Sequence, residues 1–330
     1  MTEKAYLDSS LNLRPARWED LNAVAELTHD VAEIDGDASF VLTAAELANT
    51  WKNDGFNVEH DVFIVETWDG RVVGSEEFYN ESGHFKLKAD GCVHPDFRGL
   101  GIGTSLLEKV TERANAEMEL SEPGVRVFLQ TAIINEDAAG HTLLQAEGYS
   151  PIRYFWRMEI KLPEAPPAVT FPDNIELRPF VKDEHAVSVW QADNEAFRDH
   201  WGSHDSTFED WAHRKFGNPN FDPALWMVAW DGNQVAGFSQ NRYRKGVGWI
   251  GPLGVRRPWR KKGLGLALLQ YSFGEFYKRG MTTIGLGVDA SNPTGATRLY
   301  QRAGMYVASE FVTYEKELRA GKDMKNRGKP

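Results

Sequence analysis

The sequence has almost no cysteine and no long hydrophobic run. Cys92 is the single cysteine among 330 residues, which excludes an intramolecular disulfide framework and a cysteine-rich zinc site and fits a reducing compartment. Every apolar run is much shorter than the roughly 20 residues that span a bilayer. The polar start MTEKAYLDSSLNLRP lacks the apolar core of a signal peptide. We therefore expect a cytoplasmic protein with no membrane partner.

Positive charge is scarce in the first half of the chain. Residues 1–165 carry 14 Lys and Arg against 30 Asp and Glu, whereas residues 166–330 carry 23 against 18. Part of the second excess lies in residues 320–330, which we expect to form a basic, disordered tail. Most of the remainder lies between Val255 and Gln270. This cluster is more compact than the basic face of a nucleic-acid-binding protein, so we expect a small polyanion and no nucleic acid.

Four landmarks occur twice in the same order, about 160 residues apart. They are LRP from Leu13 and Leu177, WDG from Trp68 and Trp230, VHPDFRGLGIGTSLL from Val93 and VRRPWRKKGLGLALL from Val255, and NEDAAGHTLLQAEGY from Asn135 and NPTGATRLYQRAGM from Asn292. A repeated order of this kind indicates a duplicated domain. It predicts a first domain over residues 1–162, a proline-rich linker over 163–174 and a second domain over 175–319.

Each copy has the pattern of an α/β domain. Apolar residues at helical spacing predict helices over 18–34 and 181–197. Apolar runs joined at Asp-Gly predict hairpins over 62–78 and 225–241. Two further apolar runs, 125–133 and 282–290, read as buried strands, each followed by a helix that ends at Gly148 or Gly304.

A glycine-rich loop precedes a predicted helix in the second copy. The spacing R-x-x-G-x-G holds at Arg260, Gly263 and Gly265. Glycines let a ligand approach the backbone, and the first N–H groups of a helix carry partial positive charge, so this arrangement suits a phosphate. The Gly-Lys-Ser/Thr end of a Walker loop is absent, and G-x-G alone is too weak for a dinucleotide-binding assignment. A tight turn with a solvated basic face is the alternative for this motif taken alone.

Taken together, the repeated motifs resemble the GCN5-related N-acetyltransferase (GNAT) family, in a tandem form that covers nearly the whole chain. The resemblance implies two GNAT-type domains, each a mixed, mainly antiparallel sheet flanked by helices. It also implies an acetyl-CoA-dependent enzyme that acetylates the primary amine of a small molecule, as a monomer or homodimer and without a metal. The implied cofactor-binding residues are Leu253, Gly254, Val255, Arg260, Lys261, Lys262, Gly263, Leu264, Gly265, Asn292, Ala296 and Tyr300 in the second copy, and Val93, Arg98, Gly99, Gly101, Ile102 and Gly103 in the first.

The two copies differ at the implied catalytic acid. The resemblance implies that Tyr300, four residues before Gly304, protonates the departing thiolate, whereas the first copy has Leu144 before Gly148. A leucine cannot donate a proton. The first domain is therefore predicted to be non-catalytic and the second to carry catalysis.

Two further roles follow from the implied reaction. The Val255 N–H is expected to stabilise the oxyanion, and a base is expected because amines are mostly protonated at neutral pH. Glu195 and Asp289 are the candidates for that base. Their alternatives are a solvated carboxylate on a helix face and the polar end of a strand.

More narrowly, the second half is similar to mycothiol synthase, a tandem member of the same family, in NEAFRDHWG and FDPALWMVAW. That enzyme has a glutamate where this chain has Trp249, so the acceptor is predicted to be less polar than a cysteinyl amino sugar, with Trp249 at its border, or to be recognised elsewhere. Acetylation of a cysteinyl amino sugar is the alternative activity. A non-catalytic acyl-CoA-binding regulator and a module that docks a basic partner are alternatives of other classes. His200 and His204 lack further local ligands, so we predict no metal.

Overall fold

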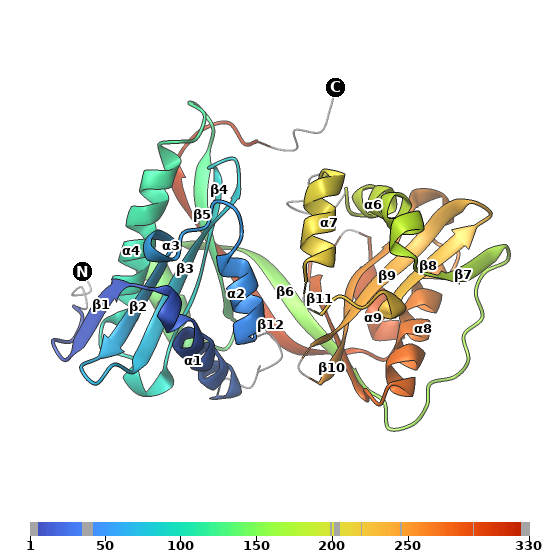
Figure 1. The fold of residues 1–330 in the computed structure, drawn as a ribbon, viewed down its shortest axis with the longest axis horizontal. Helices are drawn as coiled ribbons and strands as arrows, with labels where there is room; N and C mark the ends of the chain where they lie inside the picture. The colour runs from blue at the N-terminus through green and yellow to red at the C-terminus, as the bar shows by residue number, and fades with distance from the viewer. Residues whose placement is uncertain are drawn as a thin grey trace. The chain divides into compact units, whose positions relative to one another are not determined.

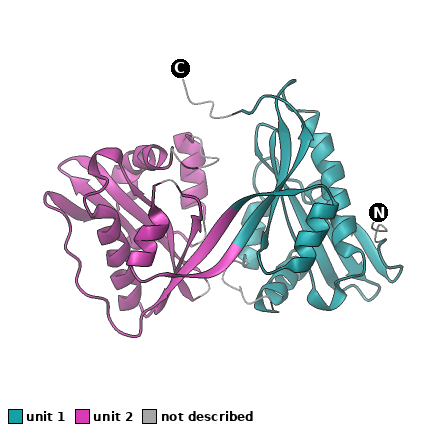
Figure 2. Cartoon of the chain, turned by 180° about the vertical axis from the view of Figure 1, so that it is seen from behind, with its two compact units in different colours: residues 1–153, 311–324 teal, residues 154–310, 325–330 magenta. Residues whose placement is uncertain are grey.

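The computed structural model describes residues 6–34, 42–198, 200, 205–218, 220–244, 246–292 and 294–324. The chain divides into two compact units (Figure 2). Unit 1 comprises Met1–Arg153 and Phe311–Met324, and unit 2 comprises Tyr154–Glu310 and Lys325–Pro330. Each unit contains a mixed sheet flanked by helices (Figure 1), which confirms the predicted fold class.

Unit 1 has the strand order β1-β2-β3-β4-β5-β12. Neighbouring strands are antiparallel except for the parallel pair β4 and β5. The elements that the first copy contributes are β1 (Leu11–Pro15), α1 (Leu21–Ile34), α2 (Ala44–Trp51), α3 (Val58–Asp61), β2 (Val62–Thr67), β3 (Val72–Ser82), β4 (Lys86–Val93), α4 (Ile102–Met118), β5 (Val127–Ile134), α5 (Ala138–Ala146) and β6 (Ser150–Lys161).

Alternation along the strands of unit 1 buries both faces of its sheet. Val62 and Ile64 of β2 pack with α1 and α2, whereas Phe63 and Val65 pack with α4. Successive side chains of a strand point to opposite faces, so one apolar run supplies two cores. The Asp-Gly hairpin is present between β2 and β3, with Gly70 at φ 86°, as the sequence predicts.

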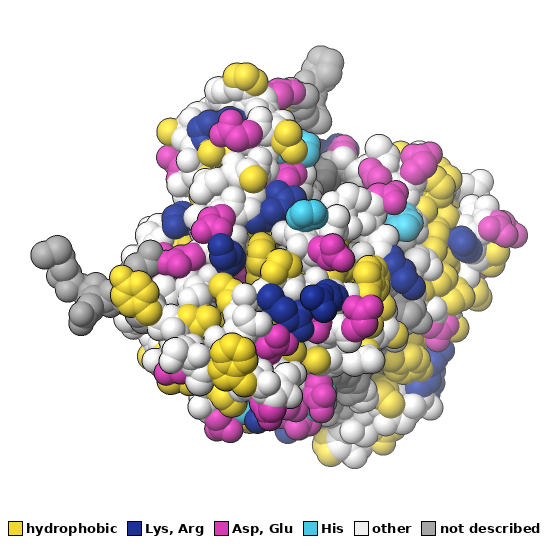
Figure 3. All heavy atoms as spheres, turned by 60° about the vertical axis from the view of Figure 1, so that its left-hand side comes forward, with side chains coloured by type: hydrophobic (Ala, Val, Ile, Leu, Met, Phe, Trp, Pro, Cys, Tyr) yellow, Lys and Arg dark blue, Asp and Glu magenta, His cyan; other side chains and the backbone are white. Residues whose placement is uncertain are grey.

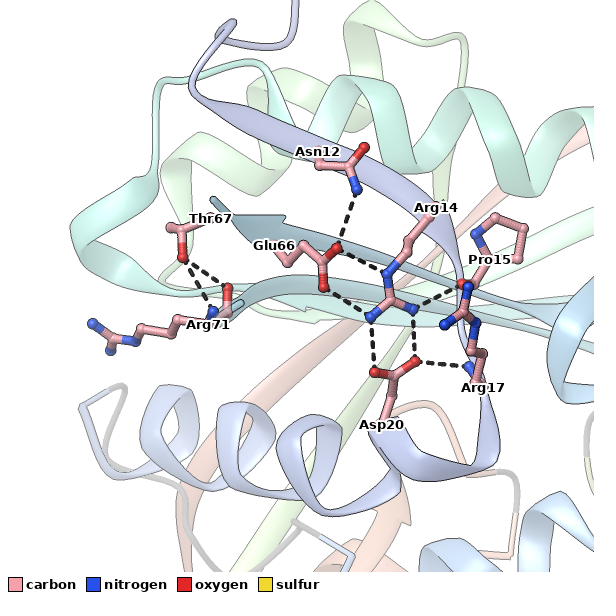
Figure 4. A network of polar contacts seen from close by, with 8 residues as sticks. All are labelled: Asn12, Arg14, Pro15, Arg17, Asp20, Glu66, Thr67 and Arg71. Carbon is pink, nitrogen blue, oxygen red and sulfur yellow. Dashed lines mark hydrogen bonds and ion pairs between the residues drawn. The ribbon is translucent and has the colours of Figure 1, made fainter. Parts of the chain in front are cut away.

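Arg14 of the repeated motif LRP connects the edge strand of unit 1 to its neighbours. Its guanidinium donates to both carboxylate oxygens of Asp20, at 2.7 and 2.9 Å, and to both of Glu66, at 2.9 and 2.8 Å (Figure 4). Asp20 precedes α1 and Glu66 lies on β2, so one side chain ties strand β1 to both. In the second copy, Arg178 instead bonds Glu176 and lies over the ring of Trp230.

Unit 2 has the strand order β6-β11-β10-β9-β8-β7, with β10 and β11 as its parallel pair. Its core lies on both faces of the sheet, against α6 and α7 on one face and α8 and α9 on the other. The elements are β7 (Ile175–Pro179), α6 (Lys182–Phe197), α7 (Phe208–Phe216), β8 (Trp226–Asp231), β9 (Gln234–Arg244), β10 (Val247–Val255), α8 (Leu264–Lys278), β11 (Thr283–Asp289), α9 (Ala296–Arg302) and β12 (Tyr306–Arg319).

The two copies exchange their last strands. β6 follows α5 of the first copy but pairs antiparallel with β11 of the second, from Phe155 to Lys161. β12 follows α9 of the second copy but pairs antiparallel with β5 of the first, from Phe311 to Arg319. Each strand therefore starts in one unit and ends in the other, as the change of colour in Figure 2 shows. The contiguous domains expected over 1–162 and 175–319 differ from this partition, because the completing strand of each sheet comes from the other copy.

The start of the expected disordered tail is ordered. Lys322 forms an isolated bridge with Val125, and its N–H donates to the carbonyl of Gly124 at 2.8 Å. Gly321 makes this approach possible, since a Cβ there would lie 2.6 Å from the carbonyl oxygen of Gly124. Residues 325–330 of the expected tail lie outside the described residues.

On the face that Figure 3 shows, basic and acidic side chains are interspersed. In the part of the chain that the structure describes, no helix combines the length and the apolar character needed to cross a membrane.

Candidate active site

In unit 2 two parallel strands part ahead of the predicted coenzyme loop. Among the described residues, β10 and β11 pair at Gly248–Trp249 with Ile284–Gly285 and no further. The loop after β10 leads into α8, whose N-cap is Gly263 at φ 88°. A Cβ on Gly263 would meet nothing within 4 Å among the described residues. The N-terminus of α8 is therefore open, and its first N–H groups can bind an anion.

The cationic side chains of this loop have different roles. The Arg260 guanidinium points back into the protein, where Nε donates to the carbonyl of Val255 at 3.0 Å and Nη2 to that of Ala196 at 3.1 Å. It therefore braces the loop against α6. Lys261 and Lys262 are exposed. Their contact with a phosphate of the coenzyme stays a prediction.

The two candidate bases are held in place by local contacts. Glu195 accepts from Arg256 Nε at 2.7 Å and from the N–H of Arg257 at 3.2 Å, so it fixes the start of the loop. Asp289 ends β11, and its Oδ1 accepts from the N–H of Ser291 at 2.9 Å. Both carboxylates have structural partners, which favours a structural role for each over that of a general base.

Tyr300 lies on α9 and is 8% exposed, in a core cluster with Leu286, Val288 and Met305. Burial raises the pKa of its hydroxyl to about 12. The group is therefore protonated at neutral pH, which a general acid requires. α9 lies close to the start of α8, since a Cβ on Gly265 of α8 would be 3.2 Å from the side chain of Leu299 on α9. Asn292 precedes α9 and accepts from the N–H of Thr294 at 2.8 Å.

Trp249 is buried, at 5% exposure, where β10 and β11 part. Its indole packs over β11, because a Cβ on Gly285 would be 3.0 Å from the ring. The guanidinium of Arg244 lies 5.2 Å from the ring centroid. The indole thus fills space beside the parting of the strands, and its contact with an acceptor stays a prediction.

Unit 1 repeats the glycine loop with one difference. Gly99 and Gly101 are left-handed, at φ 83° and 76°, and Gly101 caps α4. The chain near its N-terminus covers this loop: a Cβ on Gly101 would lie 2.2 Å from the carbonyl oxygen of Tyr6. The N–H of Asp8 donates to the carbonyl of Leu100 at 3.0 Å. The loop of unit 1 is therefore packed on one side by its own chain, unlike Gly263.

A cavity of about 1090 Å³ lies in unit 1, the unit predicted to be non-catalytic. It is lined by the parted segments of β4 and β5, by most of the glycine loop between Arg98 and Gly103, and by five carboxylate residues, Glu76, Glu77, Asp90, Asp137 and Glu147. Two adjacent acids, Glu76 and Glu77, near the end of the hairpin predicted over 62–78 were the signal in the sequence, since buried carboxylates are uncommon without a partner or a role.

The pH dependence of stability should report on Glu76, which is 7% exposed. Burial, followed by the charges of Asp90 and Glu77, raises the pKa of Glu76 to about 8, against ~4.3 in an unfolded chain. Together with burial, the charge of Glu76 in turn contributes to raising the pKa of the Cys92 thiol and of the Tyr149 hydroxyl. A carboxyl whose pKa is raised by folding costs stability as pH rises from about 5 to about 8. As the pH rises from about 5 to about 8, the free energy of unfolding of Glu76→Gln should therefore come to exceed that of the natural chain by a few kcal/mol.

Urea denaturation of both proteins at intervals from pH 5 to pH 9, followed by circular dichroism, measures this difference. Glu19→Gln, at an exposed position before α1, is the control and should follow the natural chain. If the free energy of unfolding varied with pH in the same way in Glu76→Gln and in the natural chain, the surroundings of Glu76 would not disfavour its ionised form.

Across the described residues, no group of three or more His, Cys, Asp and Glu side chains is placed to hold a metal ion. His204 lies outside the described residues, whereas the ring of His200 packs edge-on against Phe197.

Both copies match acetyltransferase families. Residues 59–151 match the family model described as acetyltransferase (GNAT) domain, and residues 186–305 match that of the acetyltransferase (GNAT) family. The mycothiol acetyltransferase of Catenulispora acidiphila is 30% identical over 237 residues, which are 69% of this chain and 71% of that protein. The protein of the same name from Streptomyces scabiei is 33% identical over 233 residues, 70% of each chain.

Solved structures with the same architecture include a GCN5-related N-acetyltransferase from Sphaerobacter thermophilus. It has a TM-score of 0.82 and 35% identity and covers 97% of this chain and 99% of its own. A tandem GNAT protein from the clavulanic acid biosynthesis pathway has a TM-score of 0.72 at 17% identity, covering 94% of this chain and 100% of its own. The second likeness concerns the fold. Together these matches confirm the resemblance predicted from the repeated motifs.

Proposed function

Because the chain belongs to the GNAT acetyltransferase family, we propose that it transfers an acetyl group from acetyl-CoA to the primary amine of a small molecule, with catalysis in unit 2. The observation that carries this proposal is the presence of three parts in one unit. These are an open helix N-terminus at Gly263, parallel strands that part beside Trp249, and a protonated buried tyrosine at position 300.

The residues of unit 2 fit the chemical parts of coenzyme A. The first N–H groups of α8 would bind the pyrophosphate, with Lys261 and Lys262 adding charge at the mouth of the loop. Gly263 leaves room for phosphate at the backbone, since nothing among the described residues stands where its Cβ would be. Arg260 contributes by fixing the loop conformation through its two carbonyl contacts.

The bound thioester supplies an acetyl carbon that a neutral amine can attack. In our proposal the Val255 N–H stabilises the negative charge that develops on the carbonyl oxygen. As the carbon–nitrogen bond forms and the carbon–sulfur bond breaks, the Tyr300 hydroxyl gives its proton to the departing sulfur. The amine loses its proton to water or a side chain, and the contacts of Glu195 and Asp289 favour water for this step.

Acetylation of a cysteinyl amino sugar is the second candidate. The relatives named mycothiol acetyltransferase favour it. Trp249 weighs against it, because an indole offers one N–H donor and an apolar face where hydroxyls and an amine would need acceptors. Turnover of that substrate by the natural chain, compared with turnover of apolar primary amines, decides between the two.

The substitution Gly263→Glu tests the coenzyme site. A carboxylate at the N-terminus of α8 would occupy the phosphate position with like charge, so we expect acetyl-CoA affinity to fall at least 100-fold, about 2.7 kcal/mol. Calorimetric titration of the full chain with acetyl-CoA measures it. If unit 1 also binds acetyl-CoA, one of two binding events should vanish.

Gly280→Glu is the matched control for that substitution. Gly280 is also left-handed, at φ 81°, and a Cβ there also meets nothing within 4 Å among the described residues, but it follows the other end of α8. The control carries the same backbone strain and the same added charge. Unchanged binding and turnover in Gly263→Glu would remove the basis for placing the coenzyme in unit 2.

A further inference from the structure

The indole of Trp249 lies at the closed end of the gap between β10 and β11. Among the described residues, these strands pair at Gly248–Trp249 with Ile284–Gly285 and then part. The register between β10 and β9 shifts between Ile250 and Leu253, as at a bulge, which bends a strand. The gap therefore opens directly after the pair that contains Trp249 and widens towards the coenzyme loop.

The six-membered ring of this indole reaches past the last pair into the gap. A Cβ on Gly285 would lie 3.0 Å from Cζ3 of Trp249, and a Cβ on Gly287 would lie 4.0 Å from its Cζ2. Gly287 follows the last paired residue of β11 by two positions, so it is on the same face of the strand. The ring therefore lies along the part of β11 that β10 has already left.

The proposed acid belongs to the same stretch of β11. Tyr300 shares a core cluster with Leu286 and Val288, the two residues that flank Gly287. A thioester whose sulfur takes a proton from Tyr300 would occupy the gap at the level of these residues. Its acyl group would then lie next to the indole, which covers Gly287 from the other face of β11.

The fold itself does not require an indole at this position. Among the described residues, Lys88 ends the pairing of β4 with β5 as Trp249 ends that of β10 with β11. Each also pairs with a residue of the preceding strand, Tyr79 and Arg242 respectively. Lys88 Nζ donates to Asp90 Oδ2 at 3.2 Å, and the gap of unit 1 opens into the cavity of about 1090 Å³. An aromatic ring at the closed end of the gap is therefore a feature of unit 2.

We propose that Trp249 sets the length of the acyl group that unit 2 accepts, admitting acetyl and excluding long straight chains. This inference rests on the proposed transfer from a coenzyme A thioester in unit 2. A chain that continued along the gap beyond the first carbons would collide with the indole. The ring is 5% exposed, is in contact with β11 at Gly285 and has the guanidinium of Arg244 5.2 Å from its centroid. A close-packed ring of this kind does not give way without a cost in packing.

Calorimetric titration of the full chain with acetyl-CoA, butyryl-CoA and octanoyl-CoA, without an amine, tests this limit. The binding event that Gly263→Glu removes belongs to unit 2, so each titration is repeated with that substitution added. In the natural chain we expect octanoyl-CoA to bind unit 2 at least 10-fold more weakly than acetyl-CoA. In Trp249→Ala, octanoyl-CoA should bind at least as tightly as acetyl-CoA, because methylene groups gain from burial once there is space for them.

Two further variants separate the length limit from a general loss of packing. Trp249→Leu keeps an apolar side chain at the position, and the ratio of its affinities for octanoyl-CoA and acetyl-CoA should be intermediate. Trp226→Ala is the matched control, since Trp226 is also a buried indole of unit 2 at 5% exposure, but it lies on β8 in the core against α6 and α7. The ratio in this control should equal that of the natural chain.

The ratio of two affinities within one protein is insensitive to its overall stability. Equal affinities of the natural unit 2 for octanoyl-CoA and acetyl-CoA, or a ratio that neither substitution of Trp249 changes, would overturn the length limit alone, because the coenzyme would still bind in unit 2. If Gly263→Glu removed no binding event, the proposed coenzyme site would fail, and the length limit would fail with it.

Discussion

Tyr300→Phe should lower kcat for acetyl transfer by about 10²–10⁴ and leave the Kd for acetyl-CoA within about 2-fold. The substitution removes a hydroxyl whose pKa burial raises to about 12, and it keeps the ring that packs against Leu286 and Met305. A proton donor used in the transition state contributes to turnover far more than to coenzyme binding. Steady-state kinetics with a saturating primary amine and calorimetry with acetyl-CoA separate the two quantities.

Tyr277→Phe is the control for that experiment, since Tyr277 packs against the same core cluster from α8. It removes a tyrosine hydroxyl from the same core cluster but from outside the proposed reaction, so kcat should not change. Natural turnover in Tyr300→Phe, combined with loss of turnover in Gly99→Glu, would assign catalysis to unit 1 instead.

Tyr314→Ala should destabilise unit 1 by about 3–5 kcal/mol, although the residue belongs to the second copy of the repeat. Tyr314 lies on β12, is 1% exposed and packs in a core with Leu107 and Leu129. Its hydroxyl contacts His141 Nδ1 at 2.7 Å. The substitution therefore creates a cavity in unit 1 and leaves a ring nitrogen without its partner.

Tyr306→Ala is the matched control on the same strand. Tyr306 is 45% exposed and lies in the part of β12 that belongs to unit 2, so we expect a change within about 0.5 kcal/mol. Urea denaturation gives the size of the effect, and limited proteolysis with mass spectrometry shows which unit opens first. Cleavage that begins in unit 2 of Tyr314→Ala would contradict the exchange of strands.

The parts of the fold that the sequence predicts are those with local causes. Alternating apolar residues and Asp-Gly turns specify the hairpins β2–β3 and β8–β9, and left-handed glycines at 148 and 304 follow helices α5 and α9 as predicted. The repeated order of the motifs was sufficient to predict two similar units. Helices α2 and α7 were not predicted, because each is short, at 8 and 9 residues, and a short apolar run carries little helical periodicity.

The parts that could not be predicted depend on contacts between distant residues. β6 and β12 each match the sheet of either copy by pattern, so no local signal tells which sheet each one completes. The motif R-x-x-G-x-G also does not predict where the Arg260 side chain points, because the carbonyls of Val255 and Ala196 come together only in the folded unit. The cavity of unit 1 arises from the parting of β4 and β5, which a list of residues cannot show.

Because β6 and β12 are exchanged, the sheet of unit 1 stays incomplete while the ribosome synthesises the second copy. β5 ends at Ile134, but the strand that pairs with its outer edge runs to Arg319. At 5–20 residues per second, synthesis of the intervening chain takes about ten to forty seconds. Throughout that interval the nascent first unit presents an unpaired strand edge, which is a template for association with other chains. A nonsense mutation between the end of α9 at Arg302 and the start of this pairing at Phe311 would make that exposure permanent, so the codons of β12 protect the product of the first copy.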